Sequence, residues 1–204
     1  MRKFNLRTLL MTAGVLILSS CNSQQEEAKN EMLTESTVEN EINYLEVGKE
    51  LALATKSNLG KNLAVAITER GSDGAVEFCN IQAIPITDSM SLLLGAEIKR
   101  VSDQPRNSDN QANEVELAYI TKWKEAHANG TDLPPMITEV DQKMIGYYPI
   151  TTNAMCLQCH GAAGKDINTA TLAKIKKLYP NDLATGYDIN ELRGIFVIKM
   201  DKKL

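Results

Sequence analysis

The sequence predicts a single α+β domain in which helices pack on an antiparallel sheet. The segments ITEV and KMIGYYPI are typical of a hairpin that turns across Asp141-Gln142, and RGIFVIKM near the end is a further strand. Long stretches with apolar residues at helical spacing precede and separate these strands. The 204 residues, 43% hydrophobic and 24% charged, suit one globular domain of ordinary core size.

Two helices are predicted at the start of this domain. Glu41 to Arg70 has apolar residues at roughly helical spacing and ends at Gly71. After the GSDG break, Ala75 to Thr87 is predicted as a second helix that Pro85 bends or ends. The periodicity of this second helix turns Cys79 inward.

The remaining elements follow from capping and turn signals. A strand, GAEIKRVS, begins near Leu94 and is followed by the loop DQPRNSDNQAN. Asn113 is predicted to cap a helix that ends at Gly130, and a last helix spans Asn168 to Leu178. The residues predicted on one face of the helix after Asn113 are Val115, Tyr119, Trp123 and Ala126.

The first 20 residues are predicted to be a signal peptide. A basic stretch, RKFNLR, precedes an apolar run from Thr8 to Leu18 that is too short to be a stable span. Its end, Leu18-Ser19-Ser20-Cys21, resembles the lipobox of bacterial lipoproteins, which implies cleavage before Cys21 and lipid attached to that cysteine. The alternatives are a plain secretory signal that ends near Ser20 and an uncleaved anchor. In each case we expect the domain to leave the cytoplasm.

Residues 21–40 are polar and are predicted to be a flexible tether, so the domain itself spans 41–204. We expect a membrane-anchored lipoprotein of the cell envelope that faces the periplasm. Asn22, in place of Asp after Cys21, favours the outer membrane by resemblance to the sorting rule of enteric bacteria.

The charge of the chain argues against nucleic acid as a partner. The formal net charge is -4, and three of the 22 basic residues lie in the predicted signal peptide. Cleavage would leave 19 basic against 26 acidic residues, a net charge of -7. An acidic chain repels the phosphate backbone.

The stretch MCLQCH contains the motif C-x-x-C-H, which is the attachment pattern of c-type haem. In that chemistry one loop supplies both functions: Cys156 and Cys159 form thioethers with the haem vinyl groups, and His160 binds the iron. One alternative is a Cys3His zinc site that also uses Cys79. Another is a redox dithiol or a disulfide.

If Cys21 carries lipid and Cys156 and Cys159 carry haem, Cys79 is the one cysteine without an assigned role. It would lie in a compartment that favours oxidation. It is either a small buried hydrophobic residue or a thiolate that binds the iron opposite His160. Other candidates for this second ligand are His127, Met90, Met136, Met144 and Met155.

Several separated segments together resemble one known family. They are AVEFCNIQA around Cys79, the loop Gln104-Pro105-Arg106-Asn107, CLQCHG, YPND, ATGY and LRG. Between Ile42 and Met200 the sequence is similar to single-haem c-type proteins with a PAS-like fold, known from a cyanobacterial Tll-type protein. The resemblance implies a PAS-like antiparallel sheet flanked by helices, with a long N-terminal helix. It also implies one covalently attached haem c with His160 as first and Cys79 as second axial ligand.

Arg106 is a candidate partner for a haem propionate, because a guanidinium matches a carboxylate bidentately. The alternative is that Arg106 pins its own Asn/Asp-rich loop. Tyr187 and Arg193 are further candidates for the propionates, although the tyrosine equally suits the core.

Two axial ligands from the protein leave no open position on the iron, so we expect one-electron transfer or the sensing of redox state or a diatomic gas, and no enzymatic activity. The expected partner is a redox or signalling protein of unknown identity. The alternatives are a haem enzyme of peroxidase type with an open distal site and a zinc-stapled interaction module.

Overall fold

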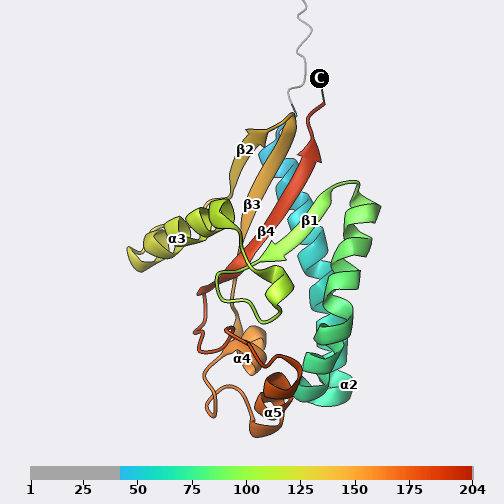
Figure 1. Ribbon diagram of the computed structural model, residues 1–204, viewed down its shortest axis with the longest axis vertical. Helices are drawn as coiled ribbons and strands as arrows, with labels where there is room; N and C mark the ends of the chain where they lie inside the picture. Colours follow the sequence, from blue (N-terminus) through green and yellow to red (C-terminus); the bar gives the residue numbers. More distant parts are fainter. Residues whose placement is uncertain (1–41, 204) are drawn as a thin grey trace, which may run out of the picture. The chain divides into compact units, whose positions relative to one another are not determined.

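The computed structural model describes residues 42–203, which form an α+β domain (Figure 1). The predicted signal peptide, the lipidation site Cys21 and the tether lie outside the described residues and stay predictions. Among residues 42–203, no helix is long and apolar enough to cross a membrane. The elements in chain order are α2 (Tyr44–Leu94), β1 (Glu97–Val101), the 3-10 turn η1 (Ser108–Asn110), α3 (Glu114–Ala128), β2 (Met136–Val140), β3 (Lys143–Thr151), α4 (Ala154–His160), α5 (Thr169–Leu178) and β4 (Leu192–Asp201).

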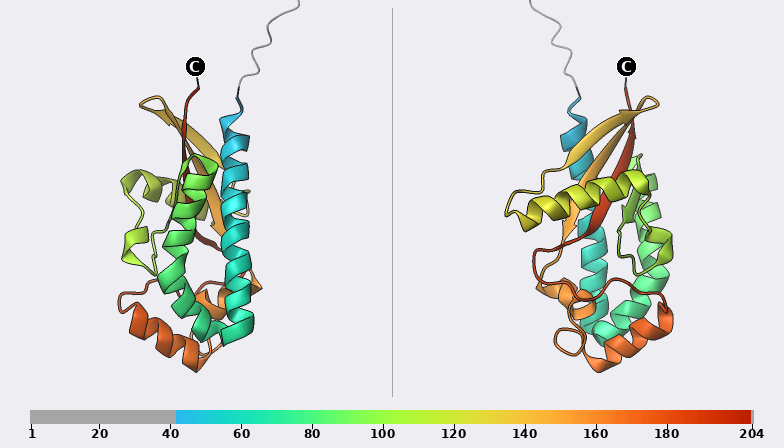
Figure 2. Two further views of the ribbon diagram at one scale, coloured as in Figure 1. Left: turned by 90° about the vertical axis from the view of Figure 1, so that its right-hand side faces the viewer. Right: turned by 60° about the vertical axis from the view of Figure 1, so that its left-hand side comes forward.

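Helix α2 consists of two arms that fold back on each other (Figure 2). The first arm begins at Asn43, whose side chain accepts a hydrogen bond from the backbone N–H of Glu46 at 3.2 Å. The arms join at Gly71, where φ is 69° and ψ is 177°. A residue without a Cβ adopts this φ at little cost, so the predicted stop at Gly71 is the bend between the arms.

The second arm continues past Pro85 to Leu94, beyond the predicted end at Thr87. Thr87 and Met90 are buried on this extension, and their packing offsets the backbone hydrogen bond that Pro85 cannot make. Gly95, with a φ of 65°, ends the arm in a left-handed cap.

The four strands form one antiparallel sheet in the order β1-β4-β3-β2. Strands β2 and β3 form the predicted hairpin, and its turn residues Asp141 and Gln142 have φ values of 49° and 59°. Two central residues with positive φ define the turn that matches the twist of a hairpin. The predicted fold class, a PAS-like antiparallel sheet flanked by helices with a long N-terminal helix, is confirmed.

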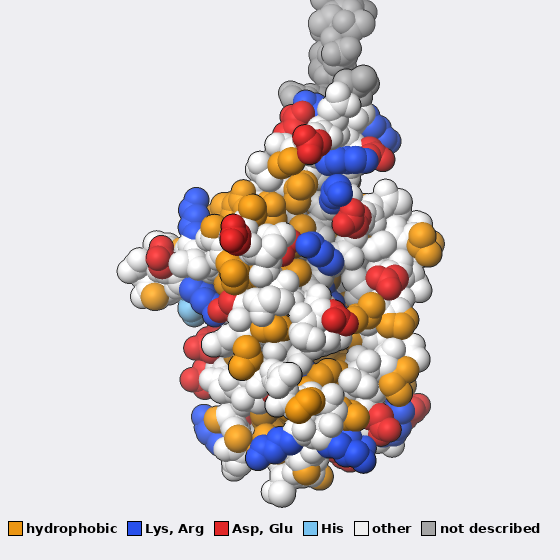
Figure 3. All heavy atoms as spheres, in the orientation of Figure 1, with side chains coloured by type: hydrophobic (Ala, Val, Ile, Leu, Met, Phe, Trp, Pro, Cys, Tyr) orange, Lys and Arg blue, Asp and Glu red, His pale blue; other side chains and the backbone are white. Residues whose placement is uncertain are grey.

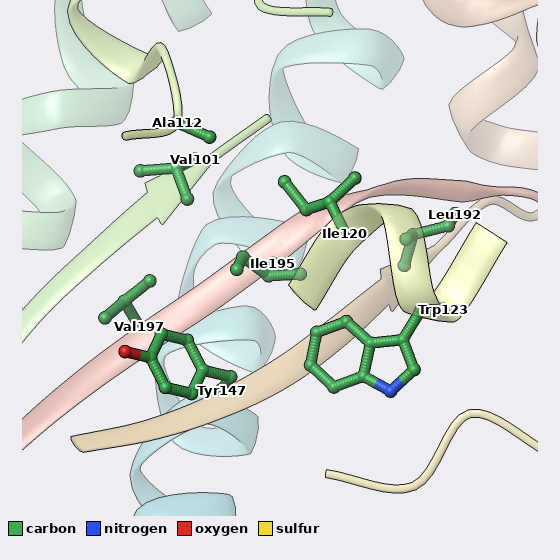
Figure 4. Close-up of a cluster of buried hydrophobic side chains, with 8 residues drawn as sticks. All are labelled: Val101, Ala112, Ile120, Trp123, Tyr147, Leu192, Ile195 and Val197. Carbon is green, nitrogen blue, oxygen red and sulfur yellow. The ribbon is translucent and has the colours of Figure 1, made fainter. Parts of the chain in front are cut away.

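Helices cover both faces of the sheet, with both arms of α2 on one face and α3 on the other (Figure 2). Successive side chains of β4 point to opposite faces of the sheet, so this strand contributes to a hydrophobic core on each face. Ile195 and Val197 face α3, whereas Phe196 and Ile198 face α2. Figure 4 shows the core under α3, which consists of Val101, Ala112, Ile120, Trp123, Tyr147, Leu192, Ile195 and Val197.

Helix α3 begins with the predicted cap at Asn113, but its buried face differs from the prediction. The buried residues are Glu116, Ile120 and Trp123, whereas Val115 is 57% exposed. Glu116 tolerates burial because its carboxylate accepts from the backbone N–H of Asn113 at 3.0 Å and lies 2.7 Å from Lys99 Nζ. The capping residue Glu116 is therefore buried, and the predicted inward position of Val115 is wrong.

Helices α4 and α5 lie at the end of the sheet opposite the chain's C-terminus, beside the bend in α2 (Figure 1). Ser72, directly after the bend, shares a buried hydrogen bond of 2.6 Å with Thr171 of α5. Val76, Ile167 and Ile175 form a small apolar cluster at the same contact. This contact closes the end of the domain that carries the C-x-x-C-H motif.

Candidate functional site

A cavity of about 330 Å³ lies between α2, the sheet and α4. Both arms of α2 contribute apolar walls, and α4 contributes the two cysteines and the histidine of the motif. Small-molecule and cofactor sites are of this size and kind, with mostly apolar walls and a few placed polar groups. The apolar residues on α2 that line it are Leu59, Leu63, Ile67, Ala75, Val76, Ala83 and Ile84.

The motif lies on a short helix rather than in the predicted loop. Asn153 caps α4 by accepting a hydrogen bond from the backbone N–H of Cys156 at 3.2 Å. Cys156, Cys159 and His160 all line the cavity. The helix therefore presents both thiols and the imidazole to one space.

The imidazole of His160 is oriented by the loop before β4. Its Nδ1 lies 2.7 Å from the backbone oxygen of Ala184 and 3.3 Å from Nε of Arg193. Nδ1 would donate a hydrogen bond to Ala184 but would accept one from Arg193. The contact with Ala184 is shorter, which favours a protonated Nδ1 that donates to this oxygen. The other ring nitrogen, Nε2, then keeps its lone pair, as a metal ligand requires.

His160 is held as a neutral imidazole. Burial lowers its pKa well below the ordinary value, and the charges of Arg193 and Arg106 lower it further, although the hydrogen bond to Ala184 acts in the opposite direction. The neutral form is the one that binds metals.

Cys79, on the second arm of α2, also lines the cavity, as the predicted inward orientation requires. Burial raises the pKa of its thiol, and the nearby Arg100 and Arg106 oppose that rise. A metal ion deprotonates a thiol that binds it, so this pKa describes the thiol without a metal. The structure thus brings together the four residues that the sequence analysis assigned to the site: Cys79, Cys156, Cys159 and His160.

Arg106 lines the cavity, but its guanidinium is turned toward Asp182 and the C-x-x-C-H helix. Its Nε lies 3.0 Å from Asp182 Oδ1, and its Nη2 donates to the backbone oxygens of Cys159 at 2.6 Å and Ala184 at 3.2 Å. Both charged side chains are nearly buried. Arg106 therefore holds the backbone around His160, and its predicted contact with a propionate stays a prediction.

Arg193 and Tyr187 lie on the His160 side of the site. Arg193 lines the cavity, and its Nη1 donates to Ser102 Oγ at 2.9 Å and to the backbone oxygen of Gln104 at 3.2 Å. The Tyr187 ring is buried, with its centroid 6.4 Å from that of His160. Tyr187 thus packs beside the imidazole but does not line the cavity.

Sequence reasoning missed Arg100, which lines the cavity from β1. Its Nη2 donates to the backbone oxygen of Ala83 at 3.3 Å, while its Nε is buried and has no hydrogen-bond partner among residues 42–203. The sequence pattern could have indicated this position. Every second residue of a strand faces the same side, so Arg100 shares a face with the buried Ile98.

The other candidate ligands are placed differently. His127 is exposed in the last turn of α3, and neither it nor Met90, Met136 or Met144 lines the cavity. Met155 does line it. Within residues 42–203, no group of three or more His, Cys, Asp or Glu side chains is arranged to hold a metal ion.

Basic side chains gather at the end of the molecule that holds α4 and α5, at the bottom of Figure 3. Lys176 and Lys177 are exposed in the last turn of α5, where a positive charge suits the helix dipole. Lys174 is paired with Glu77 of α2 at 3.1 Å.

Comparisons with known proteins bear on the fold and the family of this chain. No curated protein matches the sequence. The fold is similar to that in the crystal structure of the cyanobacterial heme-protein Tll0287, with a TM-score of 0.53 and 17% identity, over 89% of this chain and 98% of that one. At this identity the likeness establishes the fold. The model of the Tll0287-like family matches residues 14–201, so the chain belongs to the Tll0287-like family.

Proposed function

We propose that this protein is a membrane-tethered, single-haem c-type protein that acts in one-electron transfer or in the sensing of redox state or a diatomic gas. Cys156 and Cys159 would hold the haem covalently, and His160 and Cys79 would be its axial ligands. The observation that carries the proposal is that Cys79 and the C-x-x-C-H helix line one cavity. Membership of the Tll0287-like family and the likeness to a cyanobacterial haem protein also support haem as the cofactor.

The residues of the cavity fit such a group. The wall is largely apolar, as a porphyrin face requires, and the two thiols of the motif lie on one short helix beside the imidazole. The hydrogen bond from His160 Nδ1 to Ala184 leaves Nε2 for the iron. When bound, the haem would supply a one-electron redox couple, and a thiolate ligand lowers the potential of that couple.

The role of the protein in this proposal is to hold and tune the haem. Two protein ligands would leave no open position for peroxide or oxygen, so we do not propose an enzymatic activity. The peroxidase alternative needs a distal acid or base, and His127, the second histidine of the chain, is exposed on α3 outside the cavity.

The first test is the absorption and electron paramagnetic resonance spectra of the protein produced together with a c-type haem maturation system. We expect covalent haem and a low-spin ferric signal with thiolate ligation that Cys79→Ala abolishes. Met155→Leu is the matched control, because Met155 lines the same cavity and its loss should leave the signal unchanged. A colourless protein would refute the haem proposal, and a spectrum insensitive to Cys79→Ala would refute the thiolate ligand alone.

The two proposed roles, electron transfer and sensing, differ in whether Cys79 would stay bound when the haem is reduced. Burial favours the protonated thiol of Cys79, and reduction removes one positive charge from the iron, so a sensor should release this ligand on reduction. We expect the ferrous sensor to form a carbon monoxide adduct at neutral pH. Ferrous spectra that keep full thiolate ligation and show no adduct would support simple electron transfer.

We also propose that Cys21 carries lipid and tethers the domain to the periplasmic face of the outer membrane, where it meets a redox or signalling protein. Metabolic labelling with a radioactive fatty acid tests this, because Cys21→Ser should abolish both the label and sedimentation with membranes. Labelling that persists in Cys21→Ser would contradict the assignment of the lipid to this residue.

A further inference from the structure

The wall of the cavity carries positive charge without any carboxylate. Four cationic side chains line it, from both the helical and the sheet side: Lys56, Arg100, Arg106 and Arg193. None of the residues that line it, all within the described part of the chain, is Asp or Glu. A cavity with this balance attracts an anionic ligand.

Two of the arginines already have partners. Arg106 pairs with Asp182, which lies outside the cavity lining, and Arg193 donates to the uncharged oxygens of Ser102 and Gln104. Lys56 is exposed and can be solvated. The Arg100 guanidinium is held inside by one hydrogen bond to a backbone oxygen, and its Nε has no acceptor among residues 42–203.

The Arg100 side chain points from β1 toward the second arm of α2, where its Nη2 reaches the oxygen of Ala83. Its Nε is buried and has no partner among residues 42–203. Burial lowers the pKa of its guanidinium, and the nearby Cys79 and Tyr179 oppose that shift. An arginine keeps its charge in proteins, and a buried charge without a partner is strongly unfavourable. A carboxylate beside Arg100 would supply both the missing acceptor and the opposite charge.

Resting on the proposed function, we propose that Arg100 binds a propionate carboxylate of the haem and forms a carboxylate subsite on the β1 side of the cavity. A guanidinium with a free Nε–H and a neighbouring Nη–H presents two parallel donors, the arrangement that a carboxylate accepts bidentately. Arg106, the sequence-based candidate, already presents its Nε and Nη2 to Asp182. Arg100 offers such a free Nε–H from β1, whereas the Nε of Arg193 is turned toward His160 Nδ1, 3.3 Å away.

One competing partner for Arg100 is the sulfur of Cys79, which lies near it in the wall and becomes anionic when it binds a metal. Among residues 42–203, the Arg100 guanidinium donates to the oxygen of Ala83 and makes no hydrogen bond to this sulfur. A sulfur bound to iron also shares its charge with the metal, so it neutralises a guanidinium less well than a carboxylate does. The carboxylate is the better complement.

The test uses the haem-loaded full chain and its resonance Raman spectrum, in which the propionate bending band reports hydrogen bonding to the carboxylates. We expect Arg100→Met to shift this band, Arg100→Lys to restore it in part, and Arg70→Met to leave it unchanged. Arg70 is a matched control because it is an exposed arginine on α2 that stacks over Phe78 outside the cavity lining. If Arg100→Met does not accumulate, Arg100→Gln removes the charge but keeps a polar side chain.

The outcomes separate this inference from the proposed function. Absence of covalent haem in the unmodified chain would refute the proposed function. Covalent haem with an identical propionate band in wild type and Arg100→Met would overturn the subsite alone. A change of the ferric thiolate signal without a change of the propionate band would assign Arg100 to Cys79 and would also overturn the subsite.

Discussion

Nη2 of Arg106 donates a hydrogen bond of 2.6 Å to the backbone oxygen of Cys159, the residue before His160 in the chain. The same nitrogen reaches the oxygen of Ala184, which accepts from His160 Nδ1. One guanidinium thus joins the C-x-x-C-H helix to the loop that orients its histidine, and Asp182 fixes the guanidinium. The orientation of His160 depends on a contact between segments far apart in the sequence.

The first prediction concerns this contact. Arg106→Gln should lower the free energy of unfolding by about 3 kcal/mol, because Asp182 would keep a nearly buried charge without its partner. Urea denaturation of the purified protein measures the loss. Asp182→Asn should cost a comparable amount, and the double variant less than the sum of the two. Fully additive losses would show that the pair does not act as a unit.

The second prediction concerns the chemistry of Cys79. Burial raises the pKa of its thiol above the ordinary value of 9.0, so the protonated form persists at neutral pH in the haem-free chain. Alkylation of Cys79 at pH 7 should therefore be slower than that of free cysteine and should accelerate as the pH rises toward and past 9. Mass spectrometry of the protein made without haem maturation resolves the individual cysteines. Rapid labelling of Cys79 at pH 7 would contradict a raised pKa.

The third prediction concerns a close contact between α2 and the sheet at Gly48. A Cβ at Gly48 would overlap the phenol of Tyr148 and touch the terminal methyl of Met200. Overpacking costs about 1–3 kcal/mol, and replacing glycine by alanine within a helix returns about 1 kcal/mol at most, so Gly48→Ala should destabilise the protein. Thermal or urea unfolding measures the change. The loss should shrink in a Tyr148→Phe background, which removes the overlapping oxygen.

The fourth prediction concerns alkaline pH. Burial raises the pKa of Tyr148 from 10.0 to about 12, with a smaller contribution from the charge of Glu46. Between these two values the folded state retains a proton that the unfolded chain has released. The stability that this group contributes is therefore complete below pH 10 and is lost as the pH rises to about 12. Urea midpoints measured across this range should fall less steeply in Tyr148→Phe, and equal slopes would contradict the assignment.

Much of the fold follows from short-range signals. The turn at Asp141 and Gln142, the cap at Asn113 and the interruption at Gly71 each depend on a few adjacent residues, and all were predicted at these positions. Such signals act through local dihedral angles and local hydrogen bonds, which the rest of the chain need not supply.

Other features could not be predicted locally. The second arm of α2 passes Pro85 because buried residues beyond it pack against the domain, and the inner face of α3 includes Glu116 because Lys99 of β1 neutralises it. Each outcome depends on a partner from another element. Periodicity alone does not contain that information.

The order of the amino acids is enough to establish the chemistry available to this protein: a C-x-x-C-H motif, a further cysteine at position 79 and an α+β domain. Which of these groups meet depends on packing between distant elements. The bend at Gly71 and the packing of α2 against the sheet and α5 place Cys79 in the same cavity as His160, and the strand period turns Arg100 into it. Contacts between residues distant in the chain arise only when burial of apolar surface offsets the entropy of closing the intervening loops.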